Sequence, residues 1–242
     1  VVIILADDLG IGDVSSFNEN SAWETPNIDK LAARGRSFTD AHTSAALCTP
    51  TRYGILTGRY SWRTTLKKSG YDGYSNPLID NDRFTIAELF RDHGYNTSLI
   101  GKWHLGLSWQ FQGKKEVRFD DKTRRVIDFS KPISNGPEEH GFMYSYGTMA
   151  SLSSPPFVYV ENSQPTSIPE ETSVNYDEKA FWRKGPLGKD FKHANTLPNL
   201  ANRSAEYIKD QAGSNKPFFL YCALTAPHAP IIPTTEFIGK SN

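Results

Sequence analysis

Three segments of the chain have the length and composition of β-strands. Residues 1–6 form a continuous apolar and β-branched run, which predicts a strand that is buried on both faces of a parallel sheet. Residues 95–100, which follow a predicted helix, and the mostly apolar residues 218–224 are predicted as two further strands. The pattern therefore predicts a sheet whose strands come from segments far apart in the sequence.

Between these runs, apolar positions recur at helical spacing. Residues 27–35 and 85–94 each combine a polar first position with a closing glycine, which is typical of a capped helix. Residues 197–212 show helical apolar spacing as well. The alternation of strands and helices predicts an α/β fold, with a mostly parallel central sheet and helices on both faces. We interpret residues 1–242 as one principal domain.

Residues 107–195 interrupt this alternation. The segment is rich in Pro, Gly, Ser, Asn and charged residues and has little periodicity. This composition predicts a loop-rich insertion with short elements, rather than a separate domain. We expect loops that contact a substrate to lie here.

Each predicted strand is followed by side chains that are suited to catalysis or ligand binding. Asp7 and Asp8 follow the first strand, Lys102 and His104 follow the second, and His228 follows the third. In open parallel sheets, ligands bind outside the carboxyl ends of the strands. The sequence therefore predicts that these side chains converge on one site.

Asp7 and Asp8 are candidate metal ligands. Adjacent carboxylates repel each other unless positive charge lies beside them, and Ca²⁺ and Mg²⁺ take oxygen ligands. For an isolated Asp-Asp pair, loop or helix-capping aspartates are the better interpretation. The position of this pair after an apolar run, together with the other motifs, favours a metal site.

Cys48 lies in a segment, Cys-Thr-Pro-Thr-Arg, that predicts the start of a helix. Pro50 suits the first turn, so Cys48 lies where free backbone N–H groups and the helix dipole favour an anion or an ionised nucleophile. Arg52 follows four residues later, which places a cation on the same helical face. A small buried cysteine and a thiolate nucleophile are both compatible with this position. The cations nearby suit a sulfate or phosphate group better than an acyl group.

Charge and composition exclude several function classes. The 27 Lys and Arg residues balance 27 Asp and Glu residues, so nothing indicates the basic field of a nucleic-acid binder. No apolar stretch approaches the length of a membrane span, and no signal-peptide pattern precedes Val1. The first residue already lies inside an apolar strand and the last segment stops in a predicted loop, so we expect the chain to be a fragment. Cys48 and Cys222 do not predict a disulfide framework, and Cys222 is interpreted as a buried strand residue.

Taken together and in order, these motifs resemble those of the type I sulfatases of the alkaline phosphatase superfamily. The segment from Cys48 to Arg59, the Asp7-Asp8 pair, Gly-Lys-Trp-His ending at His104, and Ala-Pro-His-Ala-Pro around His228 carry the resemblance. It implies an alkaline-phosphatase-like α/β sandwich of the arylsulfatase type. It also implies that a dedicated formylglycine-generating enzyme oxidises Cys48 to Cα-formylglycine, whose hydrate is the nucleophile.

The resemblance implies a role for each motif residue. His104 would act as the base or orienting group at the residue 48 hydroxyl, and His228 would contact the sulfate and protonate the leaving group; which histidine does which is left open. Lys102 would neutralise sulfate oxygens, and Arg52 would hold the nucleophile and the charge on the metal side. Ser151 matches, less specifically, a serine hydroxyl near the sulfate.

The family's cofactor and cellular setting follow in the same way. Asp7, Asp8 and an oxygen of residue 48 would bind Ca²⁺, with Mg²⁺ as the other candidate. Further metal ligands and a second sulfate-binding lysine would come from sequence beyond the equivalent of Asn242. The resemblance also implies a periplasmic or secreted protein.

For the substrate we expect a sulfate ester, preferably of a sulfated carbohydrate. The aromatic-rich residues 155–162 resemble glycan-contacting loops, because sugars stack on aromatic rings. One alternative is a phosphonate monoester or phosphodiester hydrolase of the same superfamily. Another is a non-catalytic protein that binds sulfated glycans. The predicted partners include no nucleic acid, and no membrane span is predicted in this segment.

Overall fold

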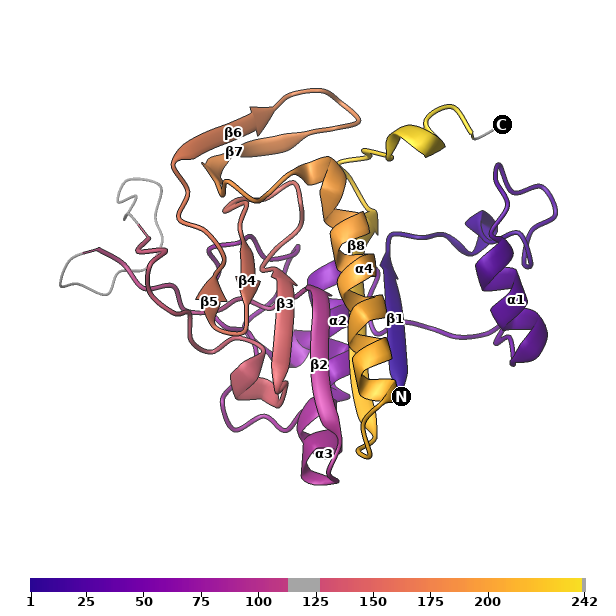
Figure 1. Cartoon of the computed structure of the whole chain (residues 1–242), viewed down its shortest axis with the longest axis horizontal. Coiled ribbons are helices and arrows are strands. Elements are labelled where there is room, and N and C mark those ends of the chain that lie inside the picture. Colours follow the sequence, from indigo (N-terminus) through magenta and orange to yellow (C-terminus); the bar gives the residue numbers. More distant parts are fainter. Residues whose placement is uncertain (113–126, 241–242) are drawn as a thin grey trace.

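In the computed structural model, which describes residues 1–112 and 127–240, the main feature is a six-stranded sheet with the order β1-β8-β2-β3-β4-β5 (Figure 1). The strands are β1 (Val2–Asp7), β2 (Asn96–Lys102), β3 (Tyr144–Thr148), β4 (Tyr159–Glu161), β5 (Gln164–Pro165), β6 (Glu171–Asn175), β7 (Trp182–Leu187) and β8 (Phe218–Pro227). The helices are α1 (Pro26–Arg34), α2 (Cys48–Thr57), α3 (Ile86–Asp92) and α4 (His193–Ala212). Strands β6 and β7 form a separate two-stranded antiparallel hairpin.

Strands β1, β8, β2 and β3 are parallel, so their carboxyl ends lie at one edge of the sheet. The register places Ile4 beside Cys222 and Ile100 beside Cys222 on the other side of β8. Strands β4 and β5 continue the sheet in antiparallel orientation. The predicted convergence of the three motif strands on one edge is therefore confirmed.

Residues of β8 alternate between two hydrophobic clusters, one on each face of the sheet. Phe219 and Tyr221 belong to the cluster that contains residues of α2 and α3. Leu220 and Cys222 belong to the other cluster, with Leu200 of α4. Figure 1 shows α4 in front of the sheet and α2 behind it. The predicted α/β fold with helices on both faces is confirmed, and so is the burial of Cys222, which is 6% exposed.

Strand β1 differs from its prediction. The apolar run at residues 1–6 was expected to be buried on both faces, but Val2 is 40% and Ile4 is 63% exposed. Among the described residues, β1 pairs only with β8, and Figure 1 shows α1 standing away from the sheet. A β-branched run thus predicted the strand correctly but not its position at the edge.

The helices begin and end close to their predicted bounds. Thr85 caps α3 through a reciprocal pair of bonds, in which Glu88 N donates to Thr85 Oγ1 at 3.2 Å and Thr85 N donates to Glu88 Oε2 at 2.9 Å. Helix α4 starts at His193, four residues before the predicted start at 197, and includes Pro198. Pro198 lacks a backbone N–H, but only one helical hydrogen bond is lost within a 20-residue helix.

The predicted loop-rich insertion, residues 107–195, contains β3, β4 and β5 of the main sheet as well as the β6–β7 hairpin. Its part at 113–126 lies outside the described residues. The expectation of a glycan-contacting aromatic loop at residues 155–162 is wrong, since Phe157 is 1% and Tyr159 is 2% exposed. Both rings pack in the cluster beneath α4, because β4 is an inner strand of the sheet.

His193, at the start of α4, is a buried aromatic residue. Its ring stacks on Trp182 with centroids 3.9 Å apart, and its Nε2 atom is buried without a hydrogen-bond partner. Burial lowers the pKa of His193 from its ordinary 6.5 to about 4. These surroundings favour a neutral structural ring for His193 rather than a substrate contact.

The buried ring of His193 makes folding stability dependent on pH. Between pH 6.5 and about 4 the unfolded side chain binds a proton that the folded one does not. The contribution of this group to folding stability is therefore fully present above pH 6.5 and falls as the pH decreases below it. We expect a loss of up to about 3 kcal/mol from this group, measured by urea unfolding at pH 7 and pH 4.5. His193→Phe should flatten the dependence, whereas His42→Gln, at an exposed position, should not. Equal pH dependence in wild type and His193→Phe would contradict this account.

Candidate active site

The carboxyl end of β1 and the first turn of α2 border one cavity. Its volume is about 250 Å³, and Asp7, Asp8, Cys48 and Arg52 are among the residues that line it. Asp7 and Asp8 are there because β1 ends at the motif, and Cys48 is there because α2 begins with it. The structure therefore brings together the predicted carboxylate pair, the predicted nucleophile position and the nearby cation.

Beneath this cavity, two cations surround the Asp7 carboxylate. Lys102 Nζ lies 2.5 Å from Asp7 Oδ2, and Arg52 Nη2 lies 3.5 Å from the same oxygen. All three side chains are buried, with exposed fractions of 5% or less. Burial, followed by repulsion from Arg52, lowers the pKa of Lys102, while attraction to Asp7 opposes both effects. One carboxylate facing two cations leaves local positive charge that suits a bound anion.

Arg52 also fixes α2 against the sheet. Its Nη1 donates to the backbone oxygen of Lys102 at 2.7 Å, and its Nη2 donates to the backbone oxygen of Leu224 at 3.3 Å. The two acceptors belong to the last residue of β2 and to the C-terminal half of β8. The guanidinium thus ties the helix that begins at Cys48 to the strands that carry Lys102 and His228.

Cys48 is partly exposed at the first position of α2, and its backbone follows an extended N-cap residue, Leu47. Thr49, Thr51 and Arg52 are buried behind it, with exposed fractions of 0%, 8% and 0%. The first helical bond runs from Thr51 N to Leu47 O at 3.0 Å. The predicted position of Cys48 at a helix N-terminus is confirmed, with the positive end of the helix dipole beside its side chain.

His104 is buried and has one free ring nitrogen. Its Nε2 lies 2.6 Å from the backbone oxygen of Tyr71, and because a carbonyl only accepts, Nε2 must carry the proton. Its Nδ1 is buried without a partner. Burial, followed by repulsion from Lys102, lowers the pKa of His104 well below its usual range. The ring is therefore held neutral, with Nδ1 as a proton acceptor.

Gly70 lies next to both His104 and Cys48. A side-chain carbon at Gly70 would lie 3.6 Å from Cys48 Sγ and 3.8 Å from His104 Cε1, so both groups border the same small volume. Tyr71 N donates to Thr49 Oγ1 at 3.0 Å, which fixes this segment to α2. Sequence reasoning singled out neither Gly70 nor Tyr71. The Ser-Gly dipeptide at 69–70 signals only a turn.

His228 lies on the opposite side, next to Asp8 and Ser151. Its Nδ1 is 2.6 Å from the backbone oxygen of Ala229 and 3.3 Å from Ser151 Oγ, and its Nε2 is 3.7 Å from Asp8 Oδ2. Donation of the Nδ1 proton to the carbonyl leaves Nε2 directed to the Asp8 side. The structure thus brings Ser151, predicted on a weaker motif, into contact with His228.

The predicted oxygen donors for a metal are Asp7 and Asp8. Asp8 has a left-handed backbone (φ 66°), and its side chain is 60% exposed. Left-handed conformations are more accessible to Asp than to most residues. Within residues 1–112 and 127–240, no cluster of three or more His, Cys, Asp and Glu side chains could hold a metal ion.

Comparisons with known proteins agree on one family. A family model described as Sulfatase matches residues 1–242. The N-acetylgalactosamine-6-O-sulfatase of Bacteroides thetaiotaomicron is 32% identical over 274 residues, covering 100% of this chain and 50% of the relative. The N-acetylgalactosamine-6-sulfatase of Rattus norvegicus is 29% identical over 248 residues, covering 100% of this chain and 42% of the relative.

A solved structure supports the same relationship. It is described under the metabolism of multiple glycosaminoglycans by Bacteroides thetaiotaomicron, and it aligns with a TM-score of 0.79 at 29% identity, covering 99% of this chain and 53% of that one. The chain thus spans about half the length of the relatives it matches. In the part of the chain that the structure describes, no helix is both long and apolar enough for a membrane span.

Proposed function

Because this chain belongs to the sulfatase family, as its motifs indicated, we propose that the protein containing it is a sulfuric ester hydrolase. The observation that carries the proposal is the arrangement around Cys48. A residue at a helix N-terminus lines a cavity with Arg52, while the Lys102 ammonium lies behind Asp7 and the free Nδ1 of His104 lies nearby. These groups suit an anionic tetrahedral substrate and a hydroxyl nucleophile.

We propose that Cys48 is converted to Cα-formylglycine by a formylglycine-generating enzyme. Its partial exposure and its place in the cavity wall are compatible with an aldehyde hydrate there. The hydrate would supply a hydroxyl that attacks sulfur. His104 is positioned to accept the proton of that hydroxyl, because Nδ1 is unprotonated and Tyr71 orients the ring.

The remaining residues would stabilise the anion and the leaving group. Lys102 and Arg52 offset the negative charge that the sulfate oxygens bring to a buried site. His228, with Ser151 at 3.3 Å, would contact the sulfate and protonate the leaving oxygen. Two observations support this division of acid and base: burial holds His104 neutral, and the His228 side chain is 23% exposed with its Nε2 atom 3.7 Å from Asp8 Oδ2.

We propose calcium as the metal that these carboxylates bind. Asp7 and Asp8 offer hard oxygen donors beside the cavity, where Ca²⁺ would supply positive charge to the nucleophile and the sulfate. Two carboxylates are fewer than the roughly six to eight oxygens that Ca²⁺ takes, so we propose that they form part of a larger ligand set with residue 48. Mg²⁺ is the other hard cation that these donors suit.

For the substrate we propose a sulfated saccharide. The support is the naming of two relatives as sulfatases of 6-sulfated N-acetylgalactosamine, at 32% and 29% identity. A monosaccharide with this modification is the first substrate to test. A periplasmic or secreted location is proposed with it, since sulfated glycans are extracellular polymers.

The experiment that tests the proposal combines mass and turnover on the full-length protein, produced alongside a formylglycine-generating enzyme. The tryptic peptide of residues 37–52 is expected to carry an aldehyde at position 48, and the protein is expected to release sulfate from an aryl sulfate. Faster release of phosphate or phosphonate from matched esters would favour the related hydrolases instead. An unmodified thiol with glycan binding but no turnover would favour the binding protein.

A further inference from the structure

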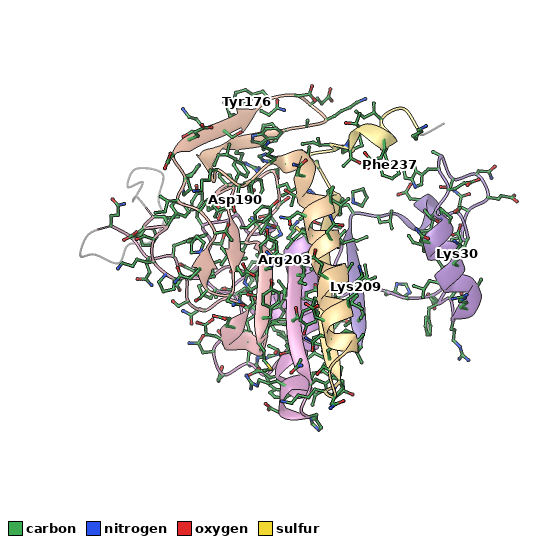
Figure 2. All side chains as sticks on the ribbon, in the orientation of Figure 1. Lys30, Tyr176, Asp190, Arg203, Lys209 and Phe237 are labelled. Atoms are coloured by element: carbon green, nitrogen blue, oxygen red, sulfur yellow. The ribbon has the colours of Figure 1, made fainter. Side chains whose placement is uncertain are left out.

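The β6–β7 hairpin lies across the carboxyl edge of the main sheet. Figure 1 shows it at the end of the molecule toward which the arrows of β1 and β2 point. Figure 2 shows Tyr176, in the turn that follows β6, at the outer rim of the molecule. Tyr176 is 78% exposed, in contrast to Phe157 and Tyr159, which are buried. The hairpin therefore offers an accessible aromatic ring at the edge of the sheet where the candidate active site lies.

Hydrogen bonds join the hairpin to both loops that hold the His228 side of the site. On one side, Arg183 N donates to Ser153 O at 3.1 Å, and Ser153 Oγ donates to Ser151 Oγ at 3.4 Å. On the other side, Ile231 N, three residues after His228, donates to Lys179 O at 2.8 Å. The hairpin is thus structurally continuous with the candidate active site.

Aromatic and cationic side chains adjoin one another on this hairpin. The ring centroids of Tyr176 and Phe181 are 6.5 Å apart, and the Arg183 guanidinium lies 5.8 Å from the centroid of Phe181. Arg183 Nη1 also donates to Ser154 Oγ at 3.2 Å. An aromatic face packs on the C–H face of a sugar ring, and a guanidinium binds carboxylate or sulfate oxygens.

Packing and hydrogen bonds hold the hairpin in place. Trp182 anchors it to the body by stacking on His193, and its Nε1 donates to Ser173 Oγ across the strands at 2.9 Å. In the turn, Asp177 Oδ1 accepts hydrogen bonds from the backbone N–H groups of residues 179 and 180 at 2.9 and 3.0 Å. A preorganised surface binds more tightly than one that must be ordered on binding.

We propose that the β6–β7 hairpin binds the saccharide chain attached to the sulfated sugar, with Tyr176 packing on a sugar ring and Arg183 contacting an anionic group of that chain. The proposal rests on the proposed function, because it assumes that the sulfate ester enters the cavity beside Cys48. It adds a determinant of specificity outside that cavity. The hairpin would make the protein prefer an oligosaccharide to a small sulfate ester.

The test compares two substrates on the full-length, modified protein: a tetrasaccharide of alternating uronic acid and 6-O-sulfated N-acetylgalactosamine, and 4-nitrophenyl sulfate. Tyr176→Ala is expected to lower kcat/KM for the tetrasaccharide roughly tenfold and to leave that for the aryl sulfate unchanged. Tyr176→Phe, which keeps the ring, should retain wild-type values. Tyr60→Ala is the matched control, because Tyr60 is 53% exposed and follows α2, which leads about 15 Å away from Cys48.

The outcomes separate the two proposals. An unchanged tetrasaccharide value in Tyr176→Ala, or an equal loss on both substrates, would overturn the role of the hairpin while leaving the sulfatase activity intact. If the wild type hydrolyses neither substrate, the proposed function fails. In that case, calorimetric titration with the tetrasaccharide tests whether the hairpin binds saccharide. Tyr176→Ala should weaken binding roughly tenfold relative to wild type. Equal affinities would overturn its role in that case too.

Discussion

Replacing Cys48 with alanine is expected to lower kcat for sulfate ester hydrolysis by a factor of about 10⁴ or more. The methyl group of alanine can be neither oxidised to an aldehyde nor act as a nucleophile. His104 would then have no hydroxyl from which to accept a proton, and the cations around Asp7 would hold the ester without a group to attack it. The rate of sulfate release by the purified full-length variant measures the effect.

Cys222→Ala is the matched control for this experiment. Cys222 is the other cysteine of the chain, but it lies in β8 beneath α4 and near Ser204, at 3.4 Å, rather than at the cavity. Its removal is expected to leave kcat unchanged. A Cys48→Ala variant that kept more than a tenth of the wild-type rate would exclude residue 48 as the nucleophile. Retention of glycan affinity with loss of turnover would be consistent with the proposed chemistry.

Lys102→Met is expected to lower the free energy of unfolding by about 3 kcal/mol, since among the described residues it leaves the buried Asp7 carboxylate with Arg52, at 3.5 Å, as its remaining cationic partner. Methionine retains the length of the buried stem, so lost packing contributes little. We also expect kcat/KM to fall about 10²-fold or more, because the sulfate would lose a preorganised cation. Denaturant unfolding and initial rates measure the two effects separately.

A double-mutant cycle identifies the source of the stability loss. In an Asp7→Asn background, Lys102→Met should cost much less, because no charged partner remains to be stranded. Lys209→Met provides the control, since Lys209 is an exposed residue of α4 and should show a change within about 0.5 kcal/mol. Equal losses in the wild-type and Asp7→Asn backgrounds would show that the ion pair with Asp7 is not the cause.

Local signals in the sequence predicted the elements and the order of the site. The polar residue Thr85 at the first position marked the start of α3, and the segment beginning at Cys48 marked the start of α2. Both features depend on backbone groups within a few residues, so neighbouring side chains determine them. The meeting of Asp7 with Lys102 was predictable too, because parallel strands bring their carboxyl ends to one edge.

Features that depend on distant neighbours were not predictable. Whether Ile4 is buried depends on what lies against β1, and the apolar run itself contains no such information. Tyr159 was predicted to lie in a sugar-binding loop, because the sequence of an aromatic run in a polar region does not distinguish a loop from an inner strand. Tyr71 orients His104 through its backbone oxygen, which every residue type possesses. Residue identity therefore gave no signal.

The burial of the first turns of α2 has a consequence for the timing of maturation. Thr49, Thr51 and Arg52 are at most 8% exposed in the folded chain, and Arg52 is held by strands β2 and β8, which continue the sheet from residues 96 and 218 onward. An enzyme that recognises these side chains could reach them only while the segment is still unfolded. If Cys48 is converted as proposed, conversion competes with folding. The yield of active protein would then depend on how long the nascent chain remains open.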